Sequence, residues 1–391
     1  MLDLRTVLDS VGSHFCWNSR YATIHAVSLI HLAPRELRKF QRKLLAWFAA
    51  GQRDLPWRKT KDPYRIWLSE IMLQQTRVAA VVPYYSKFLA RFPNLPALAR
   101  ARTEAVLQRW AGLGYYSRAR NLHRAAKEIL ARHGGGFPRG YDAALSLPGI
   151  GRYTAAAVLS IAYGEPLAVL DGNVARVVAR LGAVRGNLRA PSTWKKLDGT
   201  AQMLLARDAP GDWNQALMEL GATVCTPKSP CCAECPVAAW CRARKLGIAG
   251  QLPDSRAKRK PVRITLAAAV LLDPRGKTLV IRDGEGALFS GLWQFPVLEI
   301  TANGAAQLRR HLKKIFGLTA VGQMMPLGAA RHTVTFREVR LEPYLVRVAK
   351  LPRVQGARTP SLTRLADLPI SGATRKIADA AISFCSRVPI H

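Results

Sequence analysis

The sequence predicts an all-α domain followed by a smaller α+β domain, and three observations support this. From residue 34 to about residue 247, apolar residues recur at helical spacing between Pro and Gly breaks. Residues 250–263 form a basic, Pro-containing stretch with little apolar content, typical of a linker. Beyond it, short β-type runs surround one amphipathic helix at residues 305–316. A chain of 391 residues suits two domains of about 100–200 residues each.

The helical domain is predicted to span residues 34–249. In residues 1–33 the apolar residues do not recur at a clear helical or strand spacing, so we expect an N-terminal extension of unknown role. The first amphipathic helix follows Pro34, and one of its faces carries Leu37, Phe40, Leu44, Leu45 and Phe48. Another helix starts at Asp62–Pro63 and carries Glu70.

The second domain is predicted to span residues 264–391. Strands are expected at residues 264–272, 277–282, 334–341 and 344–348, with a Pro-Gly turn between the first two. We find no internal repeat and no low-complexity tract.

The charge of the chain favours a polyanionic partner. There are 59 Lys and Arg residues against 25 Asp and Glu residues, a net charge of +34. This favours nucleic acid or an anionic surface over a small neutral ligand. The longest apolar run, residues 266–272, is far too short for a membrane span, and the N-terminus lacks the pattern of a signal peptide. We therefore expect a cytoplasmic protein.

A glycine turn between two helical patterns is a candidate phosphate site. It contains Pro148, Gly149 and Gly151. Glycines let a phosphate approach the backbone, and the following helix offers its N-terminal N–H groups. The alternative is a turn that only packs two helices. A contact between this turn and a phosphate would hold DNA without reading its sequence.

Two carboxylates form a candidate acid pair. Glu70 lies on the same helix face as Ile66 and Leu73, so burial should raise its pKa towards 7. Asp171 is a predicted helix N-cap and should stay ionised. Cleavage of an N-glycosidic bond needs one group that protonates the leaving base and another that stabilises the sugar cation. The alternatives are a buried Glu70–Arg ion pair and a purely capping role for Asp171.

Two further segments carry amide and aromatic side chains that could wedge into a duplex. These are residues 74–76, which end the Glu70 helix, and residues 112–120, which contain Tyr115 and Tyr116. A glycosylase must flip its base out of the stack, and a side chain that fills the gap offsets the cost. For one of the two tyrosines, packing in the core is the expected alternative.

Five of the seven cysteines lie between residues 225 and 241. In an intracellular protein this clustering favours a metal over disulfides. The spacing Cys-x6-Cys-x2-Cys-x5-Cys leaves Cys231 over and contains one CxxC pair, so it favours an iron–sulfur cluster over zinc without excluding zinc. The ligand candidates are Cys225, Cys232, Cys235 and Cys241.

Over about residues 34–247 the chain resembles the helix-hairpin-helix, iron–sulfur DNA glycosylases. The resemblance rests on WLSEIMLQQT, GLGYYSRARNL, LPGIGRYTAAAVL, VLDGNVARVVARL, NQALMELG and the cysteine loop. In the endonuclease III branch a Schiff-base lysine stands two places after the last hairpin glycine, where this chain has Tyr153. With the LPWR motif and Glu70, the chain is similar to the MutY family of adenine DNA glycosylases. This resemblance implies a Nudix-like second domain.

The resemblance also implies an activity, the hydrolysis of the N-glycosidic bond of adenine mispaired with 8-oxoguanine or G in double-stranded DNA. It implies that Glu70 protonates adenine at N7 and that Asp171 stabilises or captures the sugar cation, with Tyr153 and Asn173 in support. Without a lysine nucleophile, strong lyase activity is not expected. A [4Fe–4S] cluster on the four cysteines is implied, and we expect a monomer. Arg58 and Gln215 match adenine-pocket positions. Gln75 and Tyr115 match the wedges beside the lesion, and Leu73 and Thr76 lie next to them.

The sequence departs from the family in its second domain. The family probes 8-oxoguanine with a Phe-Ser-His loop, and the aligned residues here are Val334, Thr335 and Phe336, without the histidine. We therefore expect either a weaker lesion preference or recognition by other residues such as His332, with Thr335 and Phe336 as further candidates. The helix at residues 305–316 has no carboxylate, so nucleotide hydrolysis is not expected.

Two other functions remain open at this point. One is an endonuclease III-like glycosylase and lyase for oxidised pyrimidines, which Tyr153 disfavours. The other is a non-enzymatic, redox-sensing DNA-binding protein, which would have no use for the pair Glu70 and Asp171.

Overall fold

The structure, a computed structural model, describes residues 29–254, 260–282, 291–301, 303–318, 321–334 and 336–387. Most of the predicted N-terminal extension and part of the linker lie outside these residues. By its contacts the chain divides into two compact units. The first comprises Met1–Ile71 and Phe137–Ala257, and the second comprises Met72–Gly136 and Lys258–His391. Part of the helical domain thus belongs to the same unit as the C-terminal domain.

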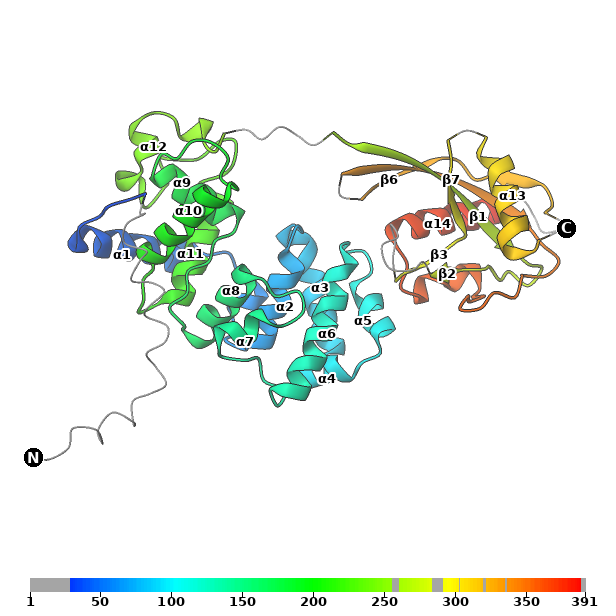
Figure 1. The fold of residues 1–391 in the computed structure, drawn as a ribbon, viewed down its shortest axis with the longest axis horizontal. Coiled ribbons are helices and arrows are strands. Elements are labelled where there is room, and N and C mark those ends of the chain that lie inside the picture. Colours follow the sequence, from blue (N-terminus) through cyan, green and yellow to red (C-terminus); the bar gives the residue numbers. More distant parts are fainter. Residues whose placement is uncertain are drawn as a thin grey trace, which may run out of the picture. The chain divides into compact units, whose positions relative to one another are not determined.

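The described part of the first unit is helical, as predicted (Figure 1). Its α-helices are α1 (Pro34–Gly51), α2 (Pro63–Leu73, ending in the second unit), α7 (Tyr141–Leu145), α8 (Arg152–Tyr163), α9 (Gly172–Leu181), α10 (Pro191–Leu204), α11 (Pro210–Thr223) and α12 (Arg242–Lys245). Short 3₁₀ turns lie at Pro56–Arg58, Ala238–Trp240 and Ala249–Gln251.

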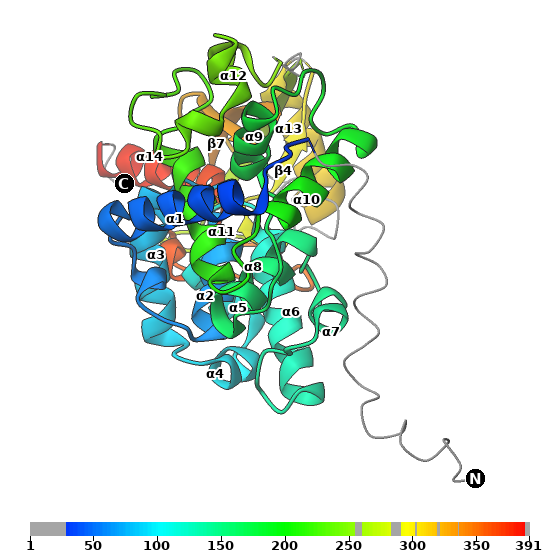
Figure 2. The ribbon, with the colours of Figure 1, turned by 90° about the vertical axis from the view of Figure 1, so that its left-hand side faces the viewer.

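Helix α1 packs by the apolar stripe that its sequence predicts. It buries Phe40, Leu44 and Phe48, and the Phe40 ring lies 5.7 Å from the Trp213 ring of α11. Figure 2 shows α1 lying across α11. Its start at Pro34 follows from the ring of proline, which suits the first helical position.

Helix α11 packs closely on α8 and α9, which carry residues of the predicted site. A Cβ atom at Gly211 would lie 2.8 Å from the Ser160 carbonyl oxygen, and one at Gly221 would lie 2.8 Å from the Asn173 Cβ. Both positions therefore require glycine. The start of α11 therefore lies against the last turn of α8, and its end lies against the first turn of α9.

The second unit begins with a helical part. Its helices are α3 (Val78–Arg91), α4 (Leu95–Arg100), α5 (Thr103–Trp110) and α6 (Tyr116–Arg132). They bury a core of aromatic and aliphatic residues, in which the Phe88 ring contacts the rings of Phe92 and Trp110 at 4.9 and 6.0 Å.

The C-terminal part of the second unit is a mixed sheet with one helix on each face. The sheet order is β4-β1-β7-β5, with β6 also paired to β7, and β1 and β7 run parallel. Strands β2 and β3 form a separate pair. The elements are β1 (Val262–Leu272), β2 (Ile281–Arg282), β3 (Trp293–Gln294), β4 (Val297–Glu299), α13 (Gly304–Phe316), β5 (Met324–Pro326), β6 (Ala330–Val334), β7 (Arg337–Arg347), a 3₁₀ turn (Leu362–Asp367) and α14 (Gly372–Arg387).

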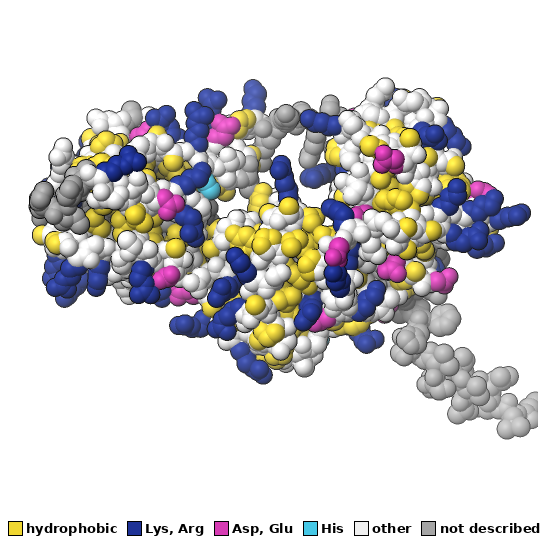
Figure 3. All heavy atoms as spheres, turned by 180° about the vertical axis from the view of Figure 1, so that it is seen from behind, with side chains coloured by type: hydrophobic (Ala, Val, Ile, Leu, Met, Phe, Trp, Pro, Cys, Tyr) yellow, Lys and Arg dark blue, Asp and Glu magenta, His cyan; other side chains and the backbone are white. Residues whose placement is uncertain are grey.

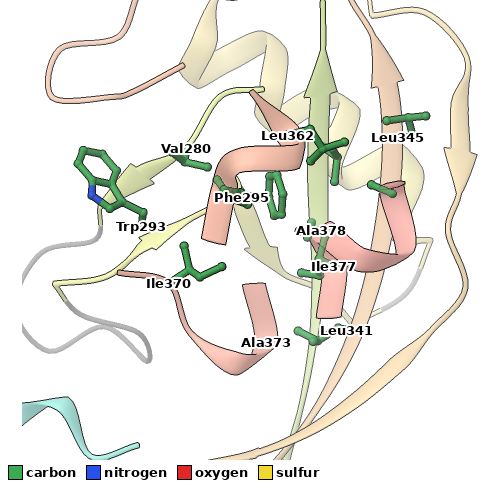
Figure 4. Close-up of a cluster of buried hydrophobic side chains, with 14 of the residues drawn as sticks. Val280, Trp293, Phe295, Leu341, Leu345, Leu362, Ile370, Ala373, Ile377 and Ala378 are labelled. Carbon is green, nitrogen blue, oxygen red and sulfur yellow. The ribbon is translucent and has the colours of Figure 1, made fainter. Parts of the chain in front are cut away.

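Alternate residues of β1 enter two different hydrophobic cores. Leu266, Ala268 and Val270 face the core of α14, which Figure 4 shows, with Phe295, Leu362 and Ile377 among its members. Ala267, Ala269 and Leu271 face the core of α13. This alternation, with both faces covered, explains the continuous apolar run of β1.

The predicted α+β class is confirmed for the C-terminal domain, and several of its predicted elements need correction. The hairpin between β6 and β7 falls inside the predicted strand 334–341, and β7 continues through Pro343 into the predicted strand 344–348. Pro343 fits because its carbonyl accepts from the Leu327 N–H and it needs no N–H of its own there. Only Ile281–Arg282 of the predicted strand 277–282 is a regular strand, and α14 was not predicted.

The charge excess is visible on the surface. On the face shown in Figure 3, Lys and Arg side chains are spread widely and Asp and Glu side chains are sparse, in line with the net charge of +34. None of the helices in the described ranges combines the length and the apolar character that crossing a membrane requires.

Candidate active site

Glu70 lies in α2 with a buried side chain, 6% exposed. The hydroxyl of Tyr153, in the first turn of α8, donates a hydrogen bond of 2.6 Å to Glu70 Oε2 and lies 3.2 Å from the sulfur of Met218 on α11. The alternative of a buried ion pair is not realised, since no described Lys, Arg or His lies within ion-pair distance of Glu70. The acid is therefore held by a neutral donor.

The surroundings of Glu70 give it the protonation behaviour of an acid catalyst. Burial raises the pKa of its carboxyl group to about 7. The hydrogen bond from Tyr153 and the charge of Arg58 oppose the rise in pKa, and the charge of Asp171 adds to it. A group with a pKa near 7 is partly protonated at neutral pH and can donate its proton.

Asp171 is the N-cap of α9, as predicted. Its Oδ1 accepts from the backbone N–H groups of Asn173 and Val174 at 2.9 and 2.7 Å. Burial raises the pKa of this carboxyl group overall, because it outweighs the two hydrogen bonds and the charge of Arg176, which lower the pKa. Because the charge of Asp171 acts on both Glu70 and Tyr153, these three groups share one site.

Asn173 connects Asp171 to the cysteine loop. Its side-chain N–H donates to Asp171 Oδ2 at 3.2 Å, and its side-chain oxygen accepts from Arg176 at 2.9 Å. Arg176 also donates to the carbonyl oxygens of Gly221 and Cys225 at 2.7 and 2.9 Å. A continuous set of hydrogen bonds therefore runs from the Asp171 carboxylate through Asn173 and Arg176 to the Cys225 carbonyl.

Arg58 and Gln215, predicted for the adenine pocket, make contacts of their own. Arg58 donates to Glu219 Oε2 at 2.7 Å, and Arg53 donates to both oxygens of the same carboxylate. These arginines lower the pKa of Glu219 to about 2 against the effect of burial, so this carboxylate is charged. Gln215 lies one turn before Glu219 on α11 and donates to the Gly211 carbonyl at 3.3 Å. None of these contacts involves a nucleobase, so the adenine-pocket role of both residues stays a prediction.

The hairpin residues have the geometry expected of a phosphate contact. Gly149 is exposed and has a φ of +76°, where glycine is favoured. Gly151 is the exposed N-cap of α8, and a Cβ there would meet nothing within 4 Å. Ile150 between them is buried, while Pro148 is half-buried. The turn thus anchors itself by one side chain and leaves its backbone open.

The candidate wedge residues lie on two loops of the second unit that share one arginine. Buried Arg118 donates to the carbonyl groups of Met72 and Gln74 and to the Thr76 hydroxyl, and also to the carbonyls of Leu113 and Gly114. Its guanidinium also lies 5.3 Å from the Tyr115 ring. One buried cation therefore fixes both loops relative to each other.

The side chains on these two loops differ in exposure. Gln75 and Tyr115 are exposed and have positive φ angles of 57° and 47°, which non-glycine residues rarely adopt. Leu73 and Thr76 are half-buried. Strained, exposed residues on a fixed frame are typical of functional loops.

Comparison with known proteins decides the family. A model of the HhH-GPD superfamily base excision DNA repair protein matches residues 68–201. The human adenine DNA glycosylase is 36% identical over 367 residues, which cover 79% of this chain and 67% of the human protein. The rat adenine DNA glycosylase is 34% identical over a match that covers 86% of this chain and 77% of the rat protein. The chain belongs to the adenine DNA glycosylase family.

Among solved structures, that of a thermostable thymine-DNA glycosylase is similar, with a TM-score of 0.50 and 30% identity, covering 54% of this chain and 98% of that one. The predicted enzyme class, a DNA glycosylase of base excision repair, is confirmed, as is the helix-hairpin-helix class of the helical domain.

The four candidate cluster ligands of this family member lie half-buried in the loop after α11. Burial raises the pKa of the Cys235 thiol to about 11, and charge on Cys225, Cys232 and Cys241 adds to the rise. Cys231 is exposed. No three His, Cys, Asp or Glu side chains of the described ranges are arranged around a point that could hold a single metal ion.

Arg180 of α9 fixes the start of this loop. It is 1% exposed and donates to the Cys225 sulfur at 3.2 Å and to the Thr226 carbonyl at 2.7 Å. It also donates to the Leu252 carbonyl at 2.8 Å, beyond the last cysteine. The loop is therefore tied to the helix that Asp171 caps.

The residues predicted for lesion recognition lie at the β6–β7 hairpin. His332 on β6 pairs with Val339 and is half-buried, and burial and the Lys376 charge lower its pKa. Phe336 lies in the turn, with the Arg337 guanidinium 5.0 Å from its ring. Thr335 lies outside the described residues.

Sequence reasoning missed four residues that hold the site together. Met218 and Glu219 lie in the NQALMELG segment, Arg118 in GLGYYSRARNL, and Arg176 in VLDGNVARVVARL, so each was quoted only as part of a motif. No local pattern marked them, because their partners are distant in sequence and only the folded chain brings them together.

Proposed function

We propose that this chain removes adenine from A opposite 8-oxoguanine or A opposite G in double-stranded DNA and that it is monofunctional. The observation that carries the proposal is the buried Glu70 carboxyl group, with a pKa of about 7, hydrogen-bonded to Tyr153 and coupled to Asp171. The adenine DNA glycosylases named above support the choice of adenine.

Binding to DNA rests on charge and on the hairpin. The net charge of +34 attracts the phosphate backbone, and the open backbone at Gly149 and Gly151 receives a phosphate at the N-terminus of α8. Gln75 and Tyr115 fill the space beside the flipped adenine, with Leu73 and Thr76 next to them. Arg58 and Gln215 line the adenine pocket, Arg58 while remaining paired with Glu219.

In the chemical step, protonated Glu70 gives its proton to N7 of adenine. The bond between C1′ and N9 then breaks, and adenine leaves with both bonding electrons and the added proton. Asp171 stabilises or captures the resulting sugar cation. Water adds to C1′ and gives one proton to the Glu70 carboxylate, which restores the acid.

Tyr153 and Asn173 support these two carboxyl groups. Burial and the charges of Glu70 and Asp171 raise the pKa of Tyr153 well above 10, so it keeps its proton and serves as a donor. Asn173 orients Asp171 by two hydrogen bonds. A tyrosine cannot form the Schiff base that strand cleavage by a lyase requires.

The four cysteines suit a [4Fe–4S] cluster. They are four half-buried cysteines, and cysteine sulfur is the ligand that iron–sulfur clusters use. Arg180 donates to the Cys225 sulfur at 3.2 Å and holds it in place. When bound, the cluster shapes the basic loop for a backbone contact.

His332, Thr335 and Phe336 contact the lesion strand.

A test of the proposal uses Glu70→Gln in the full chain, loaded with its cofactor. We expect loss of base excision on A opposite 8-oxoguanine by at least about 100-fold, because glutamine cannot donate the proton. Binding of the same duplex should stay within about threefold of wild type. Wild-type turnover in this variant would remove Glu70 from its role. Cleavage of an oxidised-pyrimidine duplex without alkali would favour the endonuclease III-like function, and binding without turnover on every mispair by the wild-type chain would favour the DNA-binding one.

A further inference from the structure

One carboxylate of helix α5 accepts hydrogen bonds from three side chains of the C-terminal part of the second unit. Glu104 accepts from Arg282 at 2.8 Å, from the indole N–H of Trp293 at 2.8 Å, and from both terminal nitrogens of Arg358 at 2.9 and 3.0 Å. The three donors come from β2, from β3 and from the segment that bridges to Val280. A two-pronged arginine contact of this kind is among the stronger polar contacts in proteins.

The donors to Glu104 pack closely against one another around Trp293. Trp293 is 4% exposed, and the guanidinium groups of Arg282 and Arg358 lie 4.2 and 4.8 Å from its ring. The two cations thus lie against the same indole that donates to Glu104. Burial raises the pKa of Glu104, but the Trp293 hydrogen bond and the two arginines outweigh it and lower the pKa overall. The carboxylate is therefore charged at neutral pH.

Further contacts extend the same surface to the start of α6. Gln108 donates to the Asp367 carbonyl at 2.6 Å, and the Tyr116 hydroxyl lies 3.5 Å from the Ile370 carbonyl. Ile370 in turn forms a bridge with Trp293. Glu104, Gln108 and Tyr116 on the helical side, with their partners, are called the docking surface below.

The docking surface reaches the loop that carries Tyr115. The Tyr116 hydroxyl accepts from the backbone N–H of Gly112 at 3.1 Å, so it contacts both the loop and the C-terminal domain. Across the loop, the Tyr84 hydroxyl donates to the Ala111 carbonyl at 3.0 Å. The exposed Tyr115 ring therefore extends from a loop that the C-terminal domain holds on one side.

We propose that Glu104 is a positioning residue for lesion specificity, which anchors the C-terminal domain to α5 so that the β6–β7 hairpin and the Tyr115 loop act together on the mispair. This inference rests on the proposed function. An anchored hairpin contacts 8-oxoguanine without the entropic cost of ordering a free domain, so loss of the anchor weakens only the contacts that the lesion itself makes.

The experiment compares Glu104→Ala with Glu128→Ala in the full, cofactor-loaded chain. Glu128 is a matched control, because its ion pair with Arg132 lies on α6 outside the docking surface and the substitution removes the same charge. The first readout is hydrogen exchange in peptides covering residues 111–116 and 291–294. The second is the ratio of single-turnover rates on A opposite 8-oxoguanine and on A opposite G.

We expect Glu104→Ala to speed exchange in both peptides and to lower the rate ratio about five- to tenfold with the rate on A opposite G nearly unchanged, while Glu128→Ala changes neither. Combining Glu104→Arg with Arg358→Glu should restore part of the exchange protection and part of the rate ratio that Glu104→Ala loses. Unchanged exchange would overturn the anchoring role, and faster exchange with an unchanged ratio would overturn the role in specificity. If the wild-type chain excised no adenine, the proposed function would fail and with it the role in specificity, while the exchange readout would still decide the anchoring.

Discussion

The hydroxyl of Tyr153 donates to Glu70 Oε2 over 2.6 Å and thereby connects two elements of the candidate site. Tyr153 lies in the first turn of α8, whose N-terminus closes the glycine hairpin, and Glu70 lies on α2. The helix proposed to contact a phosphate therefore also carries a residue that tunes the pKa of the acid.

This relationship predicts the effect of Tyr153→Phe on the pH profile. The hydrogen bond lowers the pKa of Glu70, so its removal lets the pKa rise above about 7. The alkaline limb of the single-turnover rate should move up by about one pH unit, because the acid keeps its proton longer. Tyr163→Phe is the control, since that hydroxyl lies at the other end of α8 and donates to the Phe137 carbonyl. An unmoved limb in Tyr153→Phe contradicts the assignment.

Glu70 should also destabilise the folded protein above neutral pH. Its pKa is about 7 in the folded state and 4.5 for a free glutamate side chain, so the folded state holds its proton more tightly. Stability is then lost as pH rises from 4.5 through 7, by an upper bound of about 3 kcal/mol. Glu70→Gln should therefore raise the melting temperature at pH 8 and change it little at pH 5. A gain that is equal at both values of pH speaks against a buried, protonated acid.

Glu219 predicts the opposite dependence. Its pKa is about 2 in the folded state, so its contribution is present above 4.5 and is lost as pH falls towards 2. Glu219→Gln leaves Arg58 and its neighbour Arg53 without a counter-charge and should cost about 3 kcal/mol at pH 7. Urea unfolding at pH 7 and pH 3, with Glu128→Gln as a control at a separate ion pair, measures this. A cost that does not shrink at pH 3 is the result that would count against the charged pair.

Arg118 should govern the order of the two candidate wedge loops. Arg118→Ala leaves several buried carbonyl groups unpaired and should cost about 3 kcal/mol. Hydrogen exchange should rise at residues 73–76 and 112–115. Arg124→Ala changes an exposed arginine on the same helix and should leave exchange unaltered. Equal exchange in the two variants would mean that the loops are held by other contacts.

The helical class of the first domain could be predicted because apolar residues recur at helical spacing and several helices carry a start signal. Pro34 and Pro63 mark two helix starts, and Asp171 caps a third. Glu70 stood out because burying a carboxylate among apolar residues costs free energy, so a carboxylate on an apolar helix stripe is a candidate functional group. Local sequence is sufficient for features of this kind.

The C-terminal domain was less predictable because its pairing is non-local. Strands β2 and β3 have two residues each, too few to show a period. The β6–β7 turn was hidden within a run of β-forming residues. Strand β7 continues through Pro343, whose carbonyl accepts from the Leu327 N–H. The partners of Arg118 and Arg176 are likewise distant in sequence, so only the folded chain brings them together.

The central claim is tested most directly by a single-turnover assay on end-labelled duplexes with A opposite 8-oxoguanine, A opposite G and A opposite T, each read with and without hot alkali. The account predicts cleavage at adenine only in the first two duplexes and only after alkali. Strand cleavage without alkali, or no excision by folded and cluster-loaded protein, would contradict it.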